Sequence, residues 1–136
     1  MTAALAPLIA RELATPEPAA VHRLAQMLAD PARDVAMLYY GSTLRTGDLS
    51  GILDFYRLTE RPHRRGLHGL VERVLWPEVS YHEIDVPGAG VLRAKVATMT
   101  LAGFSKAAAG RTLDTTIWAR FVQPARLVWT AHPQAA

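Results

Sequence analysis

Two short apolar runs follow each other closely in the first half of the chain and predict a pair of buried β-strands. The first covers residues 35–40 and stops at Gly41-Ser42, and the second covers residues 52–56. Both are rich in aromatic, valine, isoleucine and leucine residues and are bounded by Gly, Ser or Asp, which is typical of strands. The residues between them leave room for a short helical turn.

A second pattern, the alternation of apolar and polar residues, marks a hairpin further along the chain. Residues 79–86 alternate, turn-forming residues occupy positions 87–90, and residues 91–97 read as the partner strand. Residues 125–130 predict one more strand. These strands and the two apolar runs together suggest one sheet of about four or five strands.

Helical periodicity appears on both sides of these strands. Two helices are expected within residues 1–33, where Pro7 is tolerated only in a first turn. A later helix over residues 100–109 is expected to be capped by Thr98 or Thr100. Further helix-prone or apolar segments cover residues 67–75 and 113–122.

The composition fits one globular domain and limits its chemistry. The 136 residues are 50% hydrophobic and 20% charged, so we expect a single α+β domain, with helices in residues 1–33 and a sheet core in residues 34–130. Because cysteine is absent, disulfides and thiolate metal sites are excluded. The net charge of +3 is compatible with anionic phosphates or an anionic lipid surface, but it is too small to indicate nucleic acid.

The chain contains no segment that reads as a membrane span or a secretion signal. No apolar run approaches the roughly 18–20 residues needed to cross a bilayer. The opening segment lacks a basic start and contains Arg11 and Glu12, which makes it a poor signal peptide. We therefore expect a cytoplasmic protein.

Asp54 is the residue that most directly suggests chemistry, because a charge inside a buried strand is costly unless it is paired or binds a metal. Gly41 allows the backbone to turn sharply and approach a phosphate, and Ser42 can donate its hydroxyl and N–H to phosphate oxygens. Asp54 would hold Mg²⁺, which prefers carboxylate and phosphate oxygens. This pattern indicates nucleotidyl transfer, although Ile52 occupies the position where a second carboxylate is usual. An ordinary strand and turn is the alternative.

Other charged residues have two possible interpretations each. Arg45 either reaches a phosphate or is a solvated loop arginine. Asp48 either replaces the missing second carboxylate or forms a turn with Gly47. Glu83 and Asp85, which alternation places on one face with Tyr81, either supply a further metal ligand or form an exposed polar face. Lys95 lies mid-strand and is a candidate phosphate ligand, and residues 57–65 form a basic cluster that either binds anions or is a solvated loop.

The order and spacing of these segments resemble the mitochondrial-type phosphatidate cytidylyltransferases, the translocator assembly and maintenance family, and their bacterial relatives. The resemblance starts with Leu-Tyr-Tyr-Gly-Ser at residues 38–42 and Leu-Asp-Phe at residues 53–55. Residues 90–96 are similar to the family's Gly-Arg-Leu-x-Lys-Tyr-Gly-Val segment. Residues 118–124 are similar to its Ala-Gly-Arg-x-Gln-Lys-Pro signature. The resemblance extends over about residues 35–128.

The resemblance implies a nucleotidyltransferase-like mixed β-sheet flanked by helices, including an N-terminal helical pair. It implies an enzyme that makes CDP-diacylglycerol and pyrophosphate from CTP and phosphatidic acid with Mg²⁺, peripherally at the inner surface of a bacterial membrane. Carried over by position, Gly41 and Ser42 would contact the CTP phosphates, and Asp54 would bind the metal as the catalytic residue. Lys95 and Arg120 would neutralise phosphates of either substrate.

The chain also departs from the family pattern. Ile52 stands at a possible metal ligand position, and Ala119 and Gln123 replace the Gly and Lys of the last signature. Family members carry a helical region beyond that signature, so the resemblance implies either a fragment or a minimal version. Two alternative functions therefore stay open. One is a small nucleotidyltransferase acting on another acceptor, and the other is an inactive module that binds a nucleotide or a lipid head group.

Overall fold

The apolar runs form the strands of one sheet in the computed structural model, which describes residues 5–14, 17–60, 78–108 and 125–131. In chain order the elements are α1 (Leu5–Leu13), α2 (Ala19–Leu28), β1 (Asp34–Tyr40), α3 (Ser42–Thr46), β2 (Ile52–Thr59), β3 (Glu78–Val86), β4 (Gly90–Thr100), α5 (Leu101–Ala108) and β5 (Ala125–Thr130). The predicted strands, the hairpin and the late helix are all confirmed. The segments expected at residues 67–75 and 113–122 lie outside the described residues.

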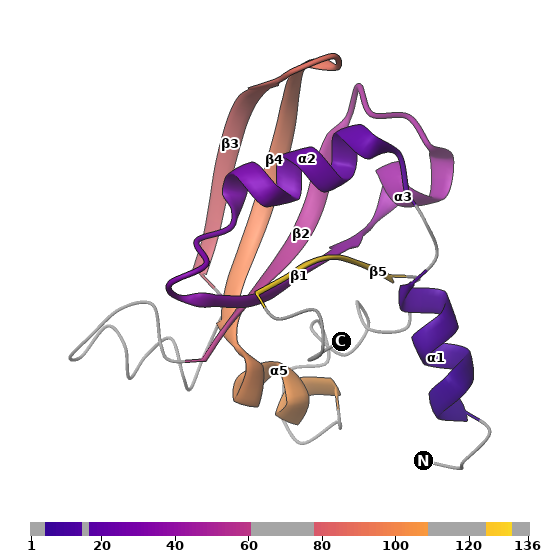
Figure 1. Ribbon diagram of the computed structural model, residues 1–136, viewed down its shortest axis with the longest axis vertical. Coiled ribbons are helices and arrows are strands. Elements are labelled where there is room, and N and C mark those ends of the chain that lie inside the picture. The colour runs from indigo at the N-terminus through magenta and orange to yellow at the C-terminus, as the bar shows by residue number, and fades with distance from the viewer. Residues whose placement is uncertain (1–4, 15–16, 61–77, 109–124, 132–136) are drawn as a thin grey trace.

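The five strands form a mixed sheet in the order β3-β4-β2-β1-β5 (Figure 1). β1 pairs antiparallel with both β2 and β5, and β3 pairs antiparallel with β4. β2 and β4 are parallel neighbours, which join the two halves of the sheet. The structure therefore confirms an α+β fold with a mixed five-stranded sheet flanked by helices.

One face of the sheet packs against α2 and forms the larger core. Val21, Leu24, Ala25 and Leu28 recur at helical spacing and are buried, as the periodicity predicts. They pack with alternate residues of the strands, including the fully buried Phe55. Burial of apolar surface between α2 and the sheet stabilises the domain and fixes which strand residues point to the opposite face.

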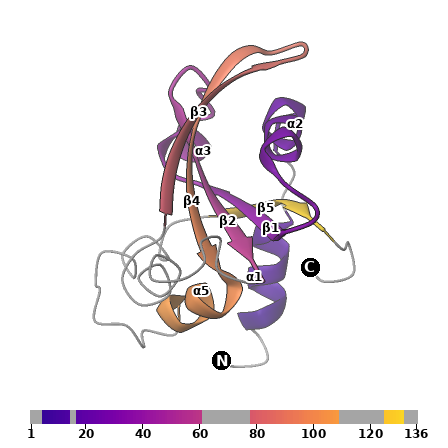
Figure 2. The same cartoon turned by 90° about the vertical axis from the view of Figure 1, so that its left-hand side faces the viewer.

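The opposite face carries a smaller apolar cluster near one end of the strands. Tyr40 and Tyr56 stack there with ring centroids 4.4 Å apart, and Phe104 of α5 meets Tyr56 edge-on at 5.6 Å. Leu13 at the end of α1 packs on the same cluster. Figure 2 shows α1 and α5 towards this end of the strands, with α2 on the other side of the sheet.

The helices correct one expectation and confirm others. α1 and α2 both form, with Pro7 in the first turn of α1, but they do not pack as a pair, because α2 lies in the larger core while Leu13 joins the smaller one. Thr100 caps α5, since its side-chain oxygen accepts a hydrogen bond from the Gly103 N–H at 2.9 Å. None of the helices in the described ranges is long and apolar enough to cross a membrane.

The assignment of Arg57 to an exposed basic cluster is wrong. β2 continues as far as Thr59, so Arg57 lies within the strand and its side chain is only 15% exposed. Its Nε lies 3.3 Å from Asp34 Oδ2, and its Nη2 donates a hydrogen bond of 2.6 Å to the Leu28 carbonyl. Arg57 therefore ties α2 to the sheet. The basic residues at positions 61, 64 and 65, and His63, lie outside the described part of the chain.

His82 on β3 makes the stability of the fold depend on pH. Its Nε2 lies 2.9 Å from Ser80 Oγ, and burial, aided by the positive charge of Arg57, lowers the pKa of the His82 imidazole. The unfolded chain then binds a proton at this side chain more readily than the folded chain does. We expect the free energy of unfolding to decrease as the pH falls from 7.5 through about 6.5. Urea unfolding at pH 7.5 and 5.5 should show a smaller difference in His82→Gln, and an undiminished difference would exclude His82 as its source.

Candidate functional site

The turn after β1 places Gly41 directly against Asp54. Gly41 has φ of 92°, in the region that favours glycine, and precedes the first residue of α3. A Cβ added to Gly41 would meet Asp54 Oδ2 first and would lie 3.2 Å from Asp54 Cβ and Cγ. The carboxylate therefore packs on bare backbone, which only glycine can provide. The spacing of the Gly-Ser turn and Asp54 in the sequence thus corresponds to a contact in space.

Buried polar contacts hold the short α3 helix in position. The Tyr39 hydroxyl donates a hydrogen bond of 2.8 Å to Thr43 Oγ1, and both residues are buried. Burial raises the pKa of the Tyr39 phenol, so the hydroxyl keeps its proton at neutral pH. Ser42, one residue before Thr43, is exposed. Ser42 is thus presented at the surface, while the buried hydrogen bond between Tyr39 and Thr43 holds the turn in place.

Asp54 is half-buried rather than fully buried as predicted. It is paired in register with Tyr40 of β1 on one side and with Lys95 of β4 on the other. Because side chains alternate along strands, and Tyr56 and Ala97 belong to the smaller cluster, Asp54 and Lys95 point to that same face. A carboxylate and an ammonium group from neighbouring strands are thus placed beside the Gly41-Ser42 turn, with access to solvent.

The other predicted carboxylates are not brought to Asp54. Asp48 Oδ1 accepts hydrogen bonds from the Ser50 N–H at 2.9 Å and the Ser50 hydroxyl at 2.7 Å, which lower the pKa of the Asp48 carboxyl. Asp48 therefore forms a local turn, here with Ser50, in agreement with its interpretation as a turn residue and not as a metal ligand. Glu83 and Asp85 are exposed on β3, and β4 lies between β3 and β2. In the described residues, no group of three His, Cys, Asp or Glu side chains forms a metal site.

Of the remaining basic candidates, Arg45 and Lys95 belong to the described residues. Arg45 is exposed in the last turn of α3, on the same segment as Ser42. Lys95 is half-buried and in register with Asp54, as described above. Arg120 lies outside the described residues. The structure therefore assembles Gly41, Ser42, Asp54 and Lys95, with Arg45 on the adjoining helix.

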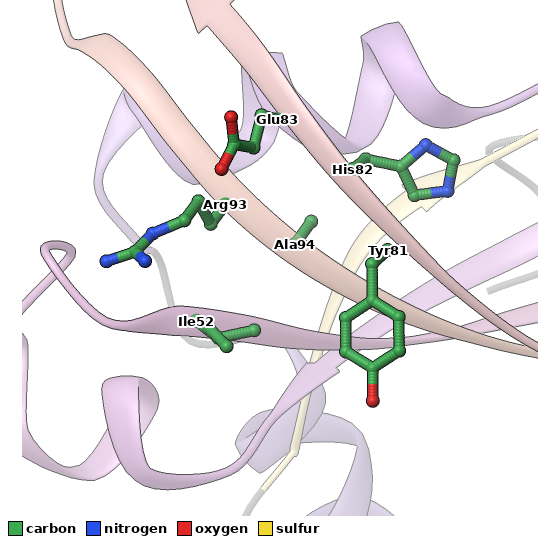
Figure 3. Close-up of a pocket in the computed structure, with 6 residues that line it drawn as sticks. All are labelled: Ile52, Tyr81, His82, Glu83, Arg93 and Ala94. Carbon is green, nitrogen blue, oxygen red and sulfur yellow. The ribbon is translucent and has the colours of Figure 1, made fainter.

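A hollow of about 250 Å³ lies beside this group and was not predicted from the sequence. It is lined by Ile52, Tyr81, His82, Glu83, Arg93 and Ala94. Figure 3 shows the Tyr81 side chain extending from β3 and the Arg93 side chain extending away from Glu83. The hollow depends on the pairing of β2 with β4, which no local pattern in the sequence indicates.

The oxygen atoms of this site suit Mg²⁺ better than a softer metal. Mg²⁺ is usually held by one or two carboxylates together with waters and substrate phosphates. The Asp54 carboxylate, which packs against the backbone of Gly41, supplies the protein part of such a set. No thiolate is available in the sequence.

Comparisons with protein-family models, curated proteins and solved structures each return no match. The functional assignment therefore depends on the geometry of this site and on the motif resemblance.

Proposed function

We propose that this protein is an Mg²⁺-dependent nucleotidyltransferase that transfers the cytidylyl group of CTP to phosphatidic acid, forming CDP-diacylglycerol and pyrophosphate. The observation that carries the proposal is the contact of the Asp54 carboxylate with the backbone of Gly41, with Lys95 in register beside it. A carboxylate, an ammonium group and a glycine turn on one accessible sheet face form a suitable site for a metal-bound triphosphate. CTP and phosphatidic acid come from the motif resemblance.

The proposed reaction exchanges one phosphoanhydride for another. An oxygen of the phosphatidate phosphate attacks the α-phosphorus of CTP and forms a new P–O bond. The bond from the α-phosphorus to the oxygen bridging it to the β-phosphate breaks, and pyrophosphate leaves with the bonding electrons. Mg²⁺, when bound, would polarise the phosphates and stabilise the charge that develops during attack.

Each residue of the site has a defined part in this scheme. Asp54 would hold the metal, and Gly41 would leave room at the turn for the Asp54 carboxylate. Ser42 would donate its hydroxyl and N–H to phosphate oxygens. Lys95 would neutralise phosphate charge, and Arg45 would reach the same anion from α3. Arg120 stays a further candidate phosphate ligand on the basis of the sequence.

A phosphate acceptor suits this set of residues better than a hydroxyl acceptor. The second pKa of a phosphate monoester is about 6, so the nucleophilic oxygen is already ionised at neutral pH. An alcohol acceptor would need a general base. The residues in register beside Asp54 are Tyr40, which is buried and stacked on Tyr56, and Lys95, which acts as a cation in this scheme, so neither serves as that base. This favours phosphatidic acid over the acceptors of a generic nucleotidyltransferase.

A module that binds the nucleotide without turning it over is the second candidate. The observation that favours it is Ile52, which occupies the position where a second metal-binding carboxylate is usual. The Asp48 carboxylate, the nearest alternative in sequence, is engaged by Ser50. Such a module would bind Mg²⁺ and CTP but would release no pyrophosphate.

Incubation of the protein with α-labelled CTP and vesicles containing phosphatidic acid tests the proposal. We expect labelled CDP-diacylglycerol and an equal amount of pyrophosphate, both lost when EDTA removes Mg²⁺. Vesicles of neutral phosphatidylcholine are the control and should yield no labelled lipid. CTP binding without product would favour the binding module, and no Mg²⁺-dependent CTP binding would exclude both candidates. Association with vesicles in the same assay tests the proposed peripheral location at a membrane.

A further inference from the structure

Arg93 and Lys95 project from the same side of β4 in consecutive outward positions. Their neighbours Leu92, Ala94 and Val96 point into the larger core, so both cations point to the face that carries Asp54. Ordinary strand geometry separates two such residues by about 6.5 Å. Lys95 is in register with Asp54, whereas Arg93 is in register with Ile52. This face therefore carries two neighbouring cations on β4. Lys95 lies beside the proposed metal ligand Asp54, and Arg93 lies two residues nearer the start of the strand.

The hollow described above adjoins this second cation. Ile52 and Tyr81 give it apolar surface, Arg93 is the cation and Glu83 the carboxylate among its lining residues, and Ala94 borders it from β4. Arg93 Nη2 donates a hydrogen bond of 3.2 Å to the Ser50 carbonyl, at the loop that leads into β2. A guanidinium group has five N–H donors, so this bond leaves donors for a ligand. Figure 3 shows the guanidinium extended away from the Glu83 carboxylate.

The side chain at position 52 affects whether Arg93 can bind an anion. Ile52 stands where a second metal-binding carboxylate would be usual, and it is a register partner of Arg93. A carboxylate at position 52 would face Arg93 across the strands and neutralise it. Glu83 of β3 is the other register partner of Arg93, but the guanidinium extends away from Glu83 (Figure 3) and donates to the Ser50 carbonyl. Ile52 therefore supplies no metal ligand and places no second carboxylate beside Arg93.

We propose that Arg93 and this hollow bind the acceptor, with the guanidinium holding a phosphate monoester and the apolar surface contacting the group attached to it. This inference rests on the proposed function, because it assigns the second substrate to a place beside the donor. Arg93 is then an acceptor-binding residue, distinct from Lys95 on the donor side. A guanidinium group suits the role because it can bind phosphate through two parallel hydrogen bonds.

Equilibrium binding to vesicles tests the inference without requiring turnover. The probe is phosphatidylcholine vesicles containing phosphatidic acid, compared with vesicles of equal charge containing phosphatidylglycerol, a phosphodiester. Both are measured with Mg²⁺ and a non-hydrolysable CTP analogue present. The variant is Arg93→Gln, and the control is Arg23→Gln. Arg23 is also exposed and also donates one hydrogen bond to a backbone carbonyl, that of Pro87 at 2.8 Å, but it lies on α2 on the other side of the sheet.

We expect Arg93→Gln to weaken binding to phosphatidic acid vesicles by roughly 10- to 100-fold, as is typical of losing hydrogen bonds to a charged group. Arg23→Gln should change it by less than about twofold, in the range of an exposed charge. Binding to phosphatidylglycerol vesicles and to the CTP analogue should be the same in wild type and Arg93→Gln. Ile52→Asp, which keeps Arg93 but places a carboxylate opposite it, should also weaken binding to phosphatidic acid vesicles.

Competition with glycerol 3-phosphate tests whether the protein recognises a free phosphate monoester or one that belongs to a lipid head group. If glycerol 3-phosphate displaces the wild-type protein from the vesicles, the phosphate monoester itself is recognised. If Arg93-dependent binding resists it, the monoester is recognised as a lipid head group. Equal losses in both arginine variants, or on both kinds of vesicle, would overturn the inference, as would normal acceptor binding by Arg93→Gln. Failure of the wild type to bind Mg²⁺ and the CTP analogue would instead overturn the proposed function.

Discussion

Replacing Asp54 with asparagine is expected to abolish Mg²⁺-dependent binding of CTP. Asparagine keeps the size of the side chain against Gly41 but removes the negative charge that would hold the metal. Loss of an outer-shell partner alone commonly lowers metal affinity roughly 10- to 100-fold, so loss of the ligand itself should exceed about 100-fold. Titration of CTP at increasing Mg²⁺ concentrations, by calorimetry or equilibrium dialysis, measures the effect.

Glu60→Gln is the matched control for this experiment. Glu60 is an exposed carboxylate just beyond the other end of β2, so its replacement removes the same charge from the same segment. It should leave the Mg²⁺ dependence of CTP binding unchanged. Urea unfolding of both variants separates a binding effect from a loss of structure. If the folded Asp54→Asn variant kept the Mg²⁺ dependence of the wild type, the proposed metal site would be wrong.

Gly41→Ala is expected to destabilise the domain and to weaken CTP binding together. The new Cβ would be forced onto the Asp54 carboxylate, and φ of 92° is strained for any residue with a side chain. Relief would require movement of either the turn or Asp54, and each movement disturbs the site. Strain of this kind and overpacking each cost a few kcal/mol, so we expect a loss of about 2–5 kcal/mol in the free energy of unfolding.

Gly47→Ala isolates the backbone part of this effect. Gly47 ends α3 with φ of 74°, but a Cβ there would meet nothing within 4 Å. It should cost only about 1 kcal/mol, the conformational penalty alone, and leave CTP affinity near that of the wild type. Urea unfolding and CTP titration of both variants give the comparison. Equal losses in the two variants would mean that the contact between Gly41 and Asp54 has no special importance.

The helices and strands, and the part of the site that contains Gly41 and Asp54, were predictable because their sequence signals are local. Alternation in residues 79–97 predicts the hairpin, and a glycine turn followed by a strand that carries an acid predicts that Gly41 and Asp54 belong to one site. The exposure of Asp54 was less predictable, because it depends on what covers the sheet. The position of Lys95 beside Asp54 confirms only that its strand faces the site, and its role stays a prediction.

The incorrect or missing predictions concern residues whose surroundings are set by contacts between separate segments of the chain. Arg57 resembles the start of a charged loop in the sequence, yet β2 continues through it and Asp34 binds it. α1 and α2 are adjacent in the chain but belong to different apolar clusters, which sequence periodicity cannot distinguish. Arg93 was not among the residues predicted for the site, because its proposed role depends on the parallel register that places it beside Ile52. No local pattern encodes that register.

The parallel pairing of β2 with β4 has a consequence for how the site is assembled. In the proposed assignment, one half of the domain (β1, α3 and β2) supplies Gly41, Ser42 and Asp54, and the other half, the β3–β4 hairpin, supplies both Lys95 and Arg93. The two halves meet only along one seam that joins residues about 40 positions apart, such as Asp54 and Lys95. Both proposed substrate sites therefore depend on this long-range pairing, because separation of β2 from β4 would take Lys95 away from Asp54 and Ile52 away from Arg93.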